Sequence, residues 1–199
     1  MDTLQDNSEA IQKAVRALHE GKTVCHATET CYGLACDMRN QEAVTTLFAI
    51  KERPEDMPVS ALFESIEQAK LFVVWNDLAD QLAREHLPGP LTIVLPLRED
   101  SGLFATPRGT ETVGVRVSPH PVAMELVRAF GGPITTTSAN IHGQPAPYSP
   151  QEIGGQFHGR KALPAILLDS GPLENRSNST VVSITGGSIE ILRHGPLQF

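Results

Sequence analysis

Two short polar segments carry side chains that are well suited to bind an anion. Lys51 and Arg53 lie two residues apart in the first, and Ser138 and Asn140 lie two apart in the second. Residues two apart in an extended backbone point to the same side, so each pair would face one target. Two cations suit a phosphate, and a hydroxyl with an amide suits a sugar, base or phosphate edge. Pro54 favours extended geometry at Arg53, because a residue before proline is biased out of the helical region.

A third candidate is an arginine inside an apolar strand. Arg116 stands between Val115 and Val117, in a segment that should be buried. A buried arginine is costly unless it is paired. A ligand carboxylate and an internal Asp or Glu would both satisfy it, and the sequence leaves both pairings open.

Other polar residues lie at the ends of expected strands. Thr28 and Thr30 would share one side of a strand end, with Glu29 opposite, although turn chemistry alone also explains these residue types. Ser179 precedes a strand. Arg193 closes the last strand, which could aim it into a cleft instead of leaving it solvated.

Helices and strands must bring these distant residues together. Apolar spacing and capping residues predict helices over 7–20, 65–72 and 77–87, one that Asn40 caps and that ends near Lys51, and one that begins at Pro121. Strands are expected over 23–30, 91–97, 113–117 and 134–137, and near 165–169, 180–184 and 188–192. Residues 141–178 form the loosest stretch and the best candidate for a mobile flap.

Composition restricts the class of protein. The chain has 199 residues, of which 40% are hydrophobic, with 16 Gly and 15 Pro, so one strand- and loop-rich α/β domain is expected rather than a helical bundle. A net charge of −7 means that the surface as a whole should not attract nucleic acid, while a local basic groove stays open. No apolar run approaches the about 20 residues that span a bilayer.

The cysteines and the missing motifs exclude several sites. Cys25, Cys31 and Cys36 are an odd number without an export signal, which predicts reduced thiols in the cytoplasm rather than a zinc site. The sequence has no P-loop, no glycine-rich dinucleotide fingerprint and no GxSxG elbow, so any nucleotide would be bound by another scheme.

Taken together, several segments resemble the YrdC/TsaC-like threonylcarbamoyl-AMP synthases of tRNA modification, over roughly residues 8 to 195. They are HATETCYGL at 26–34, KERP at 51–54, PGPLT at 88–92, VRVSPHP at 115–121, TSAN at 137–140, STVV at 179–182 and LRHG at 192–195. The resemblance implies one domain over 1–199, built as an open, twisted, mixed sheet with flanking helices and a basic concave groove.

The resemblance also implies a reaction. L-threonine, bicarbonate or CO₂, and ATP would give L-threonylcarbamoyl-AMP and pyrophosphate, with Mg²⁺ present. A separate transferase complex would then carry the threonylcarbamoyl group to adenosine 37 of tRNAs that read ANN codons. The chain itself could contact tRNA directly, and no membrane is expected.

Site residues follow from the same resemblance. Lys51 and Arg53 would act in catalysis, and ATP would contact Lys51, Arg53, Thr112, Thr136, Ser138, Asn140 and Arg193. Threonine would contact Thr28, Arg116 and Ser179, with its carboxylate on Arg116, and no side chain is expected to ligate a metal. As a clamp cation, Lys51 is expected to contribute little to the buried core.

Some positions depart from the family pattern, and two other functions stay open. His26-Ala27 replaces an aromatic residue and proline, and Leu62 stands where some members carry a histidine that contacts threonine. The alternatives are a non-catalytic module on the same fold that binds double-stranded RNA or tRNA, and a carbamoyl-transfer domain like that of hydrogenase maturation proteins. The intact KxR and SxN residues favour the synthase.

Overall fold

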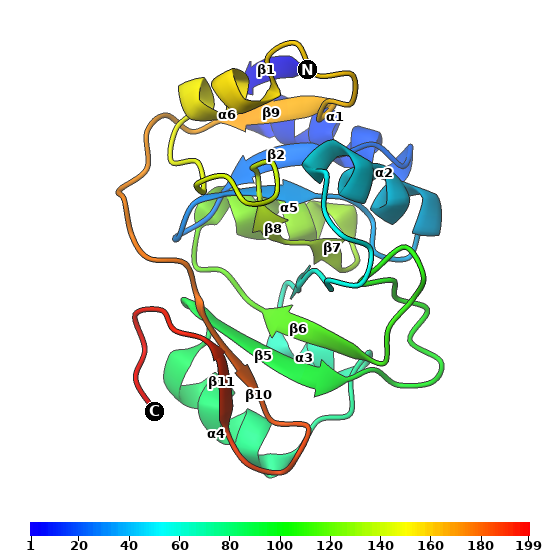
Figure 1. The fold of residues 1–199 in the computed structure, drawn as a ribbon, viewed down its shortest axis with the longest axis vertical. Helices are drawn as coiled ribbons and strands as arrows, with labels where there is room; N and C mark the ends of the chain where they lie inside the picture. The colour runs from blue at the N-terminus through cyan, green and yellow to red at the C-terminus, as the bar shows by residue number, and fades with distance from the viewer.

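The computed structural model describes residues 1–199, whose strands form two mixed sheets (Figure 1). The five-stranded sheet has the order β1 (Asp2–Gln5), β9 (Ile166–Asp169), β2 (Val24–Ala27), β3 (Tyr32–Ala35) and β8 (Thr137–Ser138). The six-stranded sheet has the order β11 (Glu190–Arg193), β10 (Thr180–Ser183), β5 (Leu91–Pro96), β6 (Thr112–Arg116), β4 (Ala61–Leu62) and β7 (Ile134–Thr135). The predicted α/β class is confirmed, but the strands divide into two sheets instead of one.

Helices cover both faces of the five-stranded sheet. On one face α1 (Ser8–His19) and α5 (Pro121–Phe130) pack with Val24 and Leu168 in one apolar cluster. On the other face α2 (Gln41–Lys51) and α6 (Pro150–Phe157) share a cluster with Tyr32 and Leu34. Burial from both sides explains why every residue of β2 and β3 is buried.

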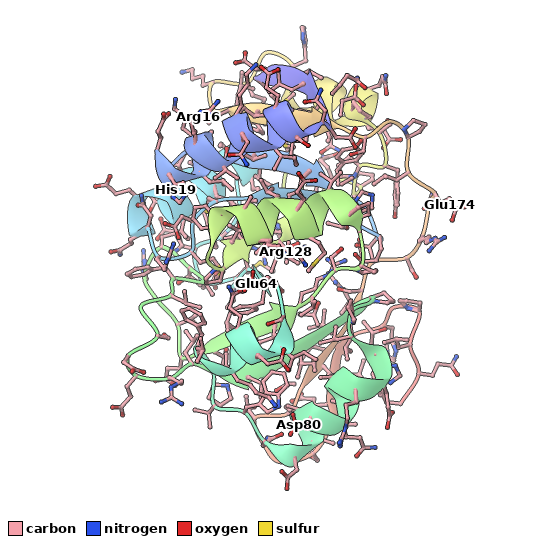
Figure 2. All side chains as sticks on the ribbon, turned by 180° about the vertical axis from the view of Figure 1, so that it is seen from behind. Arg16, His19, Glu64, Asp80, Arg128 and Glu174 are labelled. Carbon is pink, nitrogen blue, oxygen red and sulfur yellow. The ribbon has the colours of Figure 1, made fainter.

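The six-stranded sheet is covered on one face only. The helices α3 (Ile66–Lys70) and α4 (Asp77–His86) lie behind it, as Figure 2 shows, and pack against Leu91, Ile93 and Leu95 of β5. The alternate residues Thr92 and Val94 point to the opposite face, where they line a cavity. The alternation along this central strand therefore separates core from site.

One segment joins the two sheets. Within residues 134–138, β7 pairs with β4 of the six-stranded sheet, and β8 pairs with β3 of the five-stranded sheet. Between them, the backbone N–H of Thr136 donates to the carbonyl of Ser60 at 2.8 Å. Ser138 ends this crossing and Asn140 follows it, so the crossing fixes the position of both residues.

Most expected elements are confirmed, and the main exception is a helix. The side-chain oxygen of Asn40 caps α2 as predicted, and Gly131 ends α5 in the left-handed conformation. The stretch expected to be loosest contains α6, which Ser149 caps and which buries Ile153 and Phe157. None of the helices is long and apolar enough to span a membrane.

Candidate active site

A cavity of about 340 Å³ lies against the uncovered face of the six-stranded sheet. Its lining comes from both sheets (Figure 1). The contributing segments are the turn between β2 and β3, the 53–60 loop, residues 136–138 of the 134–138 crossing, and the strands β5, β6, β10 and β11. The charged lining residues are Arg53, Arg116 and Arg193, and no Asp or Glu is among them. Such a lining favours an anionic ligand.

Arg116 ends β6 and is held from one side. Its Nη2 donates to Glu29 Oε1 at 2.6 Å and to Thr30 Oγ1 at 2.7 Å. The other oxygen of Glu29 accepts a short hydrogen bond from the Ser118 hydroxyl. The internal partner that a buried arginine requires is therefore Glu29. The Nε of Arg116 has no partner, and its Nη1 makes no hydrogen bond, so the guanidinium keeps donors for a ligand.

Arg193 is fixed against the start of β10. Its Nε and Nη2 donate to the carbonyl of Ser179 at 3.0 and 2.9 Å, and Nη2 also donates to the Ser179 hydroxyl at 2.9 Å. The Ser179 hydroxyl pairs in addition with Thr92 Oγ1 at 2.9 Å. Arg193, the last residue of β11, therefore lines the cavity, which is one of the two placements that the sequence left open.

Arg53 is fixed in the loop that follows α2. Its Nε donates to the carbonyl of Met57 at 2.8 Å, and its Nη2 donates to that of Pro58 at 3.0 Å. Both acceptors are neutral carbonyls, and no carboxylate within the protein pairs with the charge of Arg53. The same is true of Arg193.

The arginines of the cavity repel one another. Burial lowers the pKa of Arg53, and the charge of Arg193 lowers it further. Burial also lowers the pKa of Arg193, and the charge of Arg116 lowers it further. Only Arg116 has a carboxylate bonded to it. An anion bound between these groups would relieve this repulsion.

Lys51 lies behind the cavity wall and not in it. Its Nζ donates to the carbonyls of Ser138 and Asn140, the latter at 2.8 Å, and to Asn140 Oδ1 at 3.0 Å. The residue is only 1% exposed, so the expectation of little core burial is wrong. Burial first, and then the charge of Arg53, lower its pKa to about 7. In this conformation Lys51 braces the turn that follows β8.

The remaining predicted residues divide between the cavity and its surroundings. Thr112, Thr136 and Ser138 line the cavity, and the buried Thr136 hydroxyl has no partner. Asn140 lies beyond the wall, where its Oδ1 accepts from Ser138 at 2.6 Å. Thr28 closes its own turn by donating to the Cys31 carbonyl at 2.6 Å. The ligand contacts of all the assigned residues stay predictions, and Lys51, Asn140 and Thr28 lie outside the cavity lining.

Sequence reasoning did not assign three residues that shape this site. Thr30 and Thr92 line the cavity, and Glu29 anchors Arg116. Leu62, where some family members carry a histidine, does not line the cavity and is fully buried in the apolar cluster with α1 and α5. Glu29 was expected on the opposite side from Thr30, but the turn brings both to Arg116. The signal that could have found Glu29 was the buried cation's need for an internal carboxylate.

The lining is suited to position charged substrates. Burial raises the pKa of the Cys31 thiol, so this lining residue stays protonated and is a poor nucleophile. No group of three or more His, Cys, Asp and Glu side chains is arranged so that it could hold a metal ion. The side-chain donors include guanidinium groups, hydroxyls and the Asn178 amide, which bind phosphate and carboxylate oxygens.

Comparisons with known proteins point to one family. The Sua5_yciO_yrdC family model, described as "Telomere recombination", matches residues 16–195. A Vibrio cholerae protein named threonylcarbamoyl-AMP synthase is 38% identical over 191 residues, which cover 94% of this chain and 98% of that protein. A Bacillus subtilis protein of the same name is 34% identical over 195 residues, which cover 98% of this chain and 56% of that protein.

Solved structures agree with the sequence comparisons. Pyrococcus abyssi Sua5 complexed with L-threonine matches with a TM-score of 0.86 and 33% identity, over 98% of this chain and 57% of that one. Escherichia coli YciO matches with a TM-score of 0.84 at 21% identity, over 99% and 95% of the two chains, and shows the fold. The chain thus spans little more than half of some relatives and nearly all of others. From its sequence and its fold, this chain belongs to the Sua5/YciO/YrdC family.

Proposed function

We propose that this protein synthesises L-threonylcarbamoyl-AMP from L-threonine, bicarbonate or CO₂, and ATP, with release of pyrophosphate. The observation that carries the proposal is a cavity with three arginines and no acidic lining residue, in which one arginine, Arg116, keeps free donors. A triphosphate and an amino-acid carboxylate together supply the anionic oxygens that this lining needs. Relatives named threonylcarbamoyl-AMP synthase support the choice of substrates.

In this proposal the cavity has two regions. ATP would lie toward Arg53 and Arg193, with Thr112, Thr136 and Ser138 beside it and with Lys51 and Asn140 at the supporting turn. Threonine would place its carboxylate on Arg116, near Ser179 and the turn that contains Thr28. The short distance of 2.9 Å between Ser179 Oγ and Arg193 Nη2 links the two regions. A shared wall of this kind would hold both substrates within reach of each other.

The chemistry follows from this placement. The threonine amine adds to CO₂ and loses a proton, which gives a carbamate. A carbamate oxygen then attacks the α-phosphorus of ATP, and the bond to the oxygen that bridges to the β-phosphorus breaks. Pyrophosphate leaves with that electron pair. The step needs no protein nucleophile, and Arg53 and Arg193 would stabilise the charge that develops on the phosphates.

Magnesium fits this scheme only as a companion of the triphosphate. The cavity lining contains no carboxylate that could ligate the ion, and most of its polar side chains are guanidinium groups and hydroxyls. We therefore place any Mg²⁺ on the phosphate oxygens of ATP, where it would neutralise part of their charge. We further propose that a separate transferase passes the product to tRNA in the cytoplasm, where the three free thiols of this chain would stay reduced.

The test is release of pyrophosphate from ATP, measured with and without L-threonine and bicarbonate. We expect release to require both, and we expect mass spectrometry to detect the threonylcarbamoyl adenylate. Release that does not depend on threonine would contradict the proposal. No release together with tight binding to structured RNA would replace it with the RNA-binding alternative.

A further inference from the structure

We propose that Glu29 is a positioning residue, which holds Arg116 in the orientation that receives the threonine carboxylate. The inference rests on the proposed function and adds to it a determinant of threonine affinity. Glu29 does not line the main cavity, whereas Arg116 does. The carboxylate therefore holds the guanidinium from behind and leaves the cavity side open to a ligand.

Both oxygens of Glu29 are used at the end of β6. Oε1 accepts from Arg116 Nη2 at 2.6 Å, and Oε2 accepts from the Ser118 hydroxyl. Glu29 belongs to the turn between β2 and β3 of one sheet. Of its two partners, Arg116 ends a strand of the other sheet and Ser118 lies two residues beyond that end. One carboxylate thus fixes the arginine and ties together the two sheets that form the cavity.

The way in which Arg116 is held leaves it ready to bind. Both hydrogen bonds of its guanidinium leave from Nη2, to Glu29 and to Thr30, while Nη1 makes none. Unlike the unpartnered Nε, Nη1 is not fully enclosed. A flexible arginine loses rotamer freedom when it binds a ligand, and prior anchoring removes much of that cost. Glu29 would therefore strengthen threonine binding without contacting threonine.

Charge gives a second reason. The side chains of Arg116 and Glu29 are only 8% and 11% exposed, so their charges are poorly screened by water. Without Glu29, Arg116 would be a buried cation beside Arg193 with no counterion. Such a group would move away from Arg193 or lose its ordered geometry. The opposite role would be competition, in which Glu29 and the threonine carboxylate compete for Arg116. In that case Glu29 would weaken threonine binding in the wild type, and its removal would tighten it.

The experiment compares the Glu29→Gln variant with the wild type by calorimetric titration of L-threonine and by steady-state kinetics. We expect the threonine Kd and KM to rise about 10- to 100-fold, the range for loss of a hydrogen bond between charged groups. The KM for ATP should change less than about twofold, since Arg53 and Arg193 keep their own anchors. The matched control is Glu9→Gln, which removes an exposed ion pair to Lys13 and should leave both constants unchanged.

A double-mutant cycle separates anchoring from direct contact. If Glu29 acts through Arg116, adding Glu29→Gln to Arg116→Lys should weaken threonine binding no further. Additive losses would mean that Glu29 contacts threonine itself and would overturn the inference. Unchanged or tighter threonine binding by Glu29→Gln would also overturn it.

A milder variant guards against loss of the fold. Ser118→Ala keeps the Glu29 carboxylate and removes the hydrogen bond to Oε2, together with the one that the hydroxyl accepts from the His120 N–H at 3.1 Å. We expect it to raise the threonine Kd about 2- to 10-fold with unchanged ATP kinetics. Equal threonine affinity in Ser118→Ala and wild type would count against anchoring. A wild type that makes no threonylcarbamoyl adenylate would overturn the proposed function, whereas an active wild type with an unaffected Glu29→Gln would overturn this inference alone.

Discussion

Lys51 combines a full set of hydrogen bonds with almost complete burial. Three acceptors surround its Nζ, and all belong to Ser138 and Asn140. An ammonium group has three N–H donors, so these acceptors favour its charged form. Burial acts in the opposite direction and lowers its pKa to about 7. The side chain is therefore close to titration at neutral pH, in contrast to an exposed lysine.

The first prediction concerns the Lys51→Met variant, which keeps most of the side-chain volume. Loss of Nζ leaves buried acceptors of the turn after β8 unpaired, which should cost about 1–3 kcal/mol of unfolding free energy. Displacement of Ser138 should also reduce pyrophosphate release by about 100-fold. Urea unfolding and the activity assay measure the two effects. Wild-type turnover in a folded variant would show that neither the amine nor its turn is needed.

The second prediction is a pH dependence that the same lysine causes. Its pKa is about 7 in the folded protein and 10.5 for an ordinary lysine, so between these values the unfolded chain binds a proton that the folded chain does not. Stability contributed by Lys51 should therefore rise with pH across this window, by up to about 1.4 kcal/mol per pH unit. Below about pH 7 the lysine is protonated in both the folded and the unfolded chain, and the folded protein then bears the full free-energy cost of the buried charge.

This slope is best measured as a difference between two proteins. Urea unfolding of the wild type and of Lys51→Met, from about pH 7 to about pH 9, should show a free-energy difference that grows with pH. The effect of the buried thiol of Cys36, whose pKa burial raises to about 12, occurs in both proteins and cancels. Parallel curves would show that the acceptors hold the lysine charged throughout.

Residue types in the sequence identified the arginines of the site but not the group that orients one of them. Arg53, Arg116 and Arg193 were all assigned, and all three line the cavity. Glu29 was not, because its contact with Arg116 joins residues 87 positions apart. A cation in an apolar strand shows that a partner is needed, but only the tertiary fold selects it.

At the scale of elements, local chemistry explains which ones were predictable. The helices α1 and α2 carry asparagine caps and regular apolar spacing, so their bounds follow from the sequence. The strands β4, β7 and β8 have two residues each, and they exist because neighbouring strands pair with them. The helix α6 contains Gly154 and Gly155, which lower its intrinsic propensity, and burial of Ile153 and Phe157 offsets that loss.

The third prediction concerns the hairpin of β10 and β11, which carries Arg193. A Cβ on Gly195 would lie 2.4 Å from the backbone nitrogen of Thr180 and 2.5 Å from the carbonyl oxygen of Asn178. Backbone atoms cannot yield easily, so Gly195→Ala should push the end of β11 away from Ser179. We expect a loss of about 1–3 kcal/mol in stability and a raised KM for ATP.

The matched control lies in the same hairpin. Gly186 is exposed, and a Cβ placed there meets no atom within 4 Å, so Gly186→Ala should leave the KM for ATP unchanged. Thermal unfolding and ATP kinetics of the two variants give the comparison. If Gly195→Ala kept both the stability and the KM of the wild type, the close approach of β11 to β10 would not be required for the site.

At the scale of the whole molecule, the cavity is built where two sheets meet. The apolar cluster with α1 and α5 joins the two sheets, because it contains Leu62 and Ile134 of the six-stranded sheet. The 134–138 crossing and the contact between Glu29 and Arg116 connect the sheets beside the cavity. A ligand in this place would touch both sheets at once. Binding should therefore stabilise the connection between them and not only the strand that carries a given contact.

The last prediction follows from that arrangement. With L-threonine already saturating, a non-hydrolysable ATP analogue at about 100 times its own Kd should add about 2.7 kcal/mol to the free energy of unfolding. Amide hydrogen exchange should slow in the turn between β2 and β3, in the 134–138 crossing and at the ends of β6 and β11. The outer helices α1 and α4 should show smaller changes, because they contact the far sides of the sheets. Protection confined to the six-stranded sheet would mean that the five-stranded sheet takes no part in binding, and the placement of threonine beside the turn that contains Thr28 would fail.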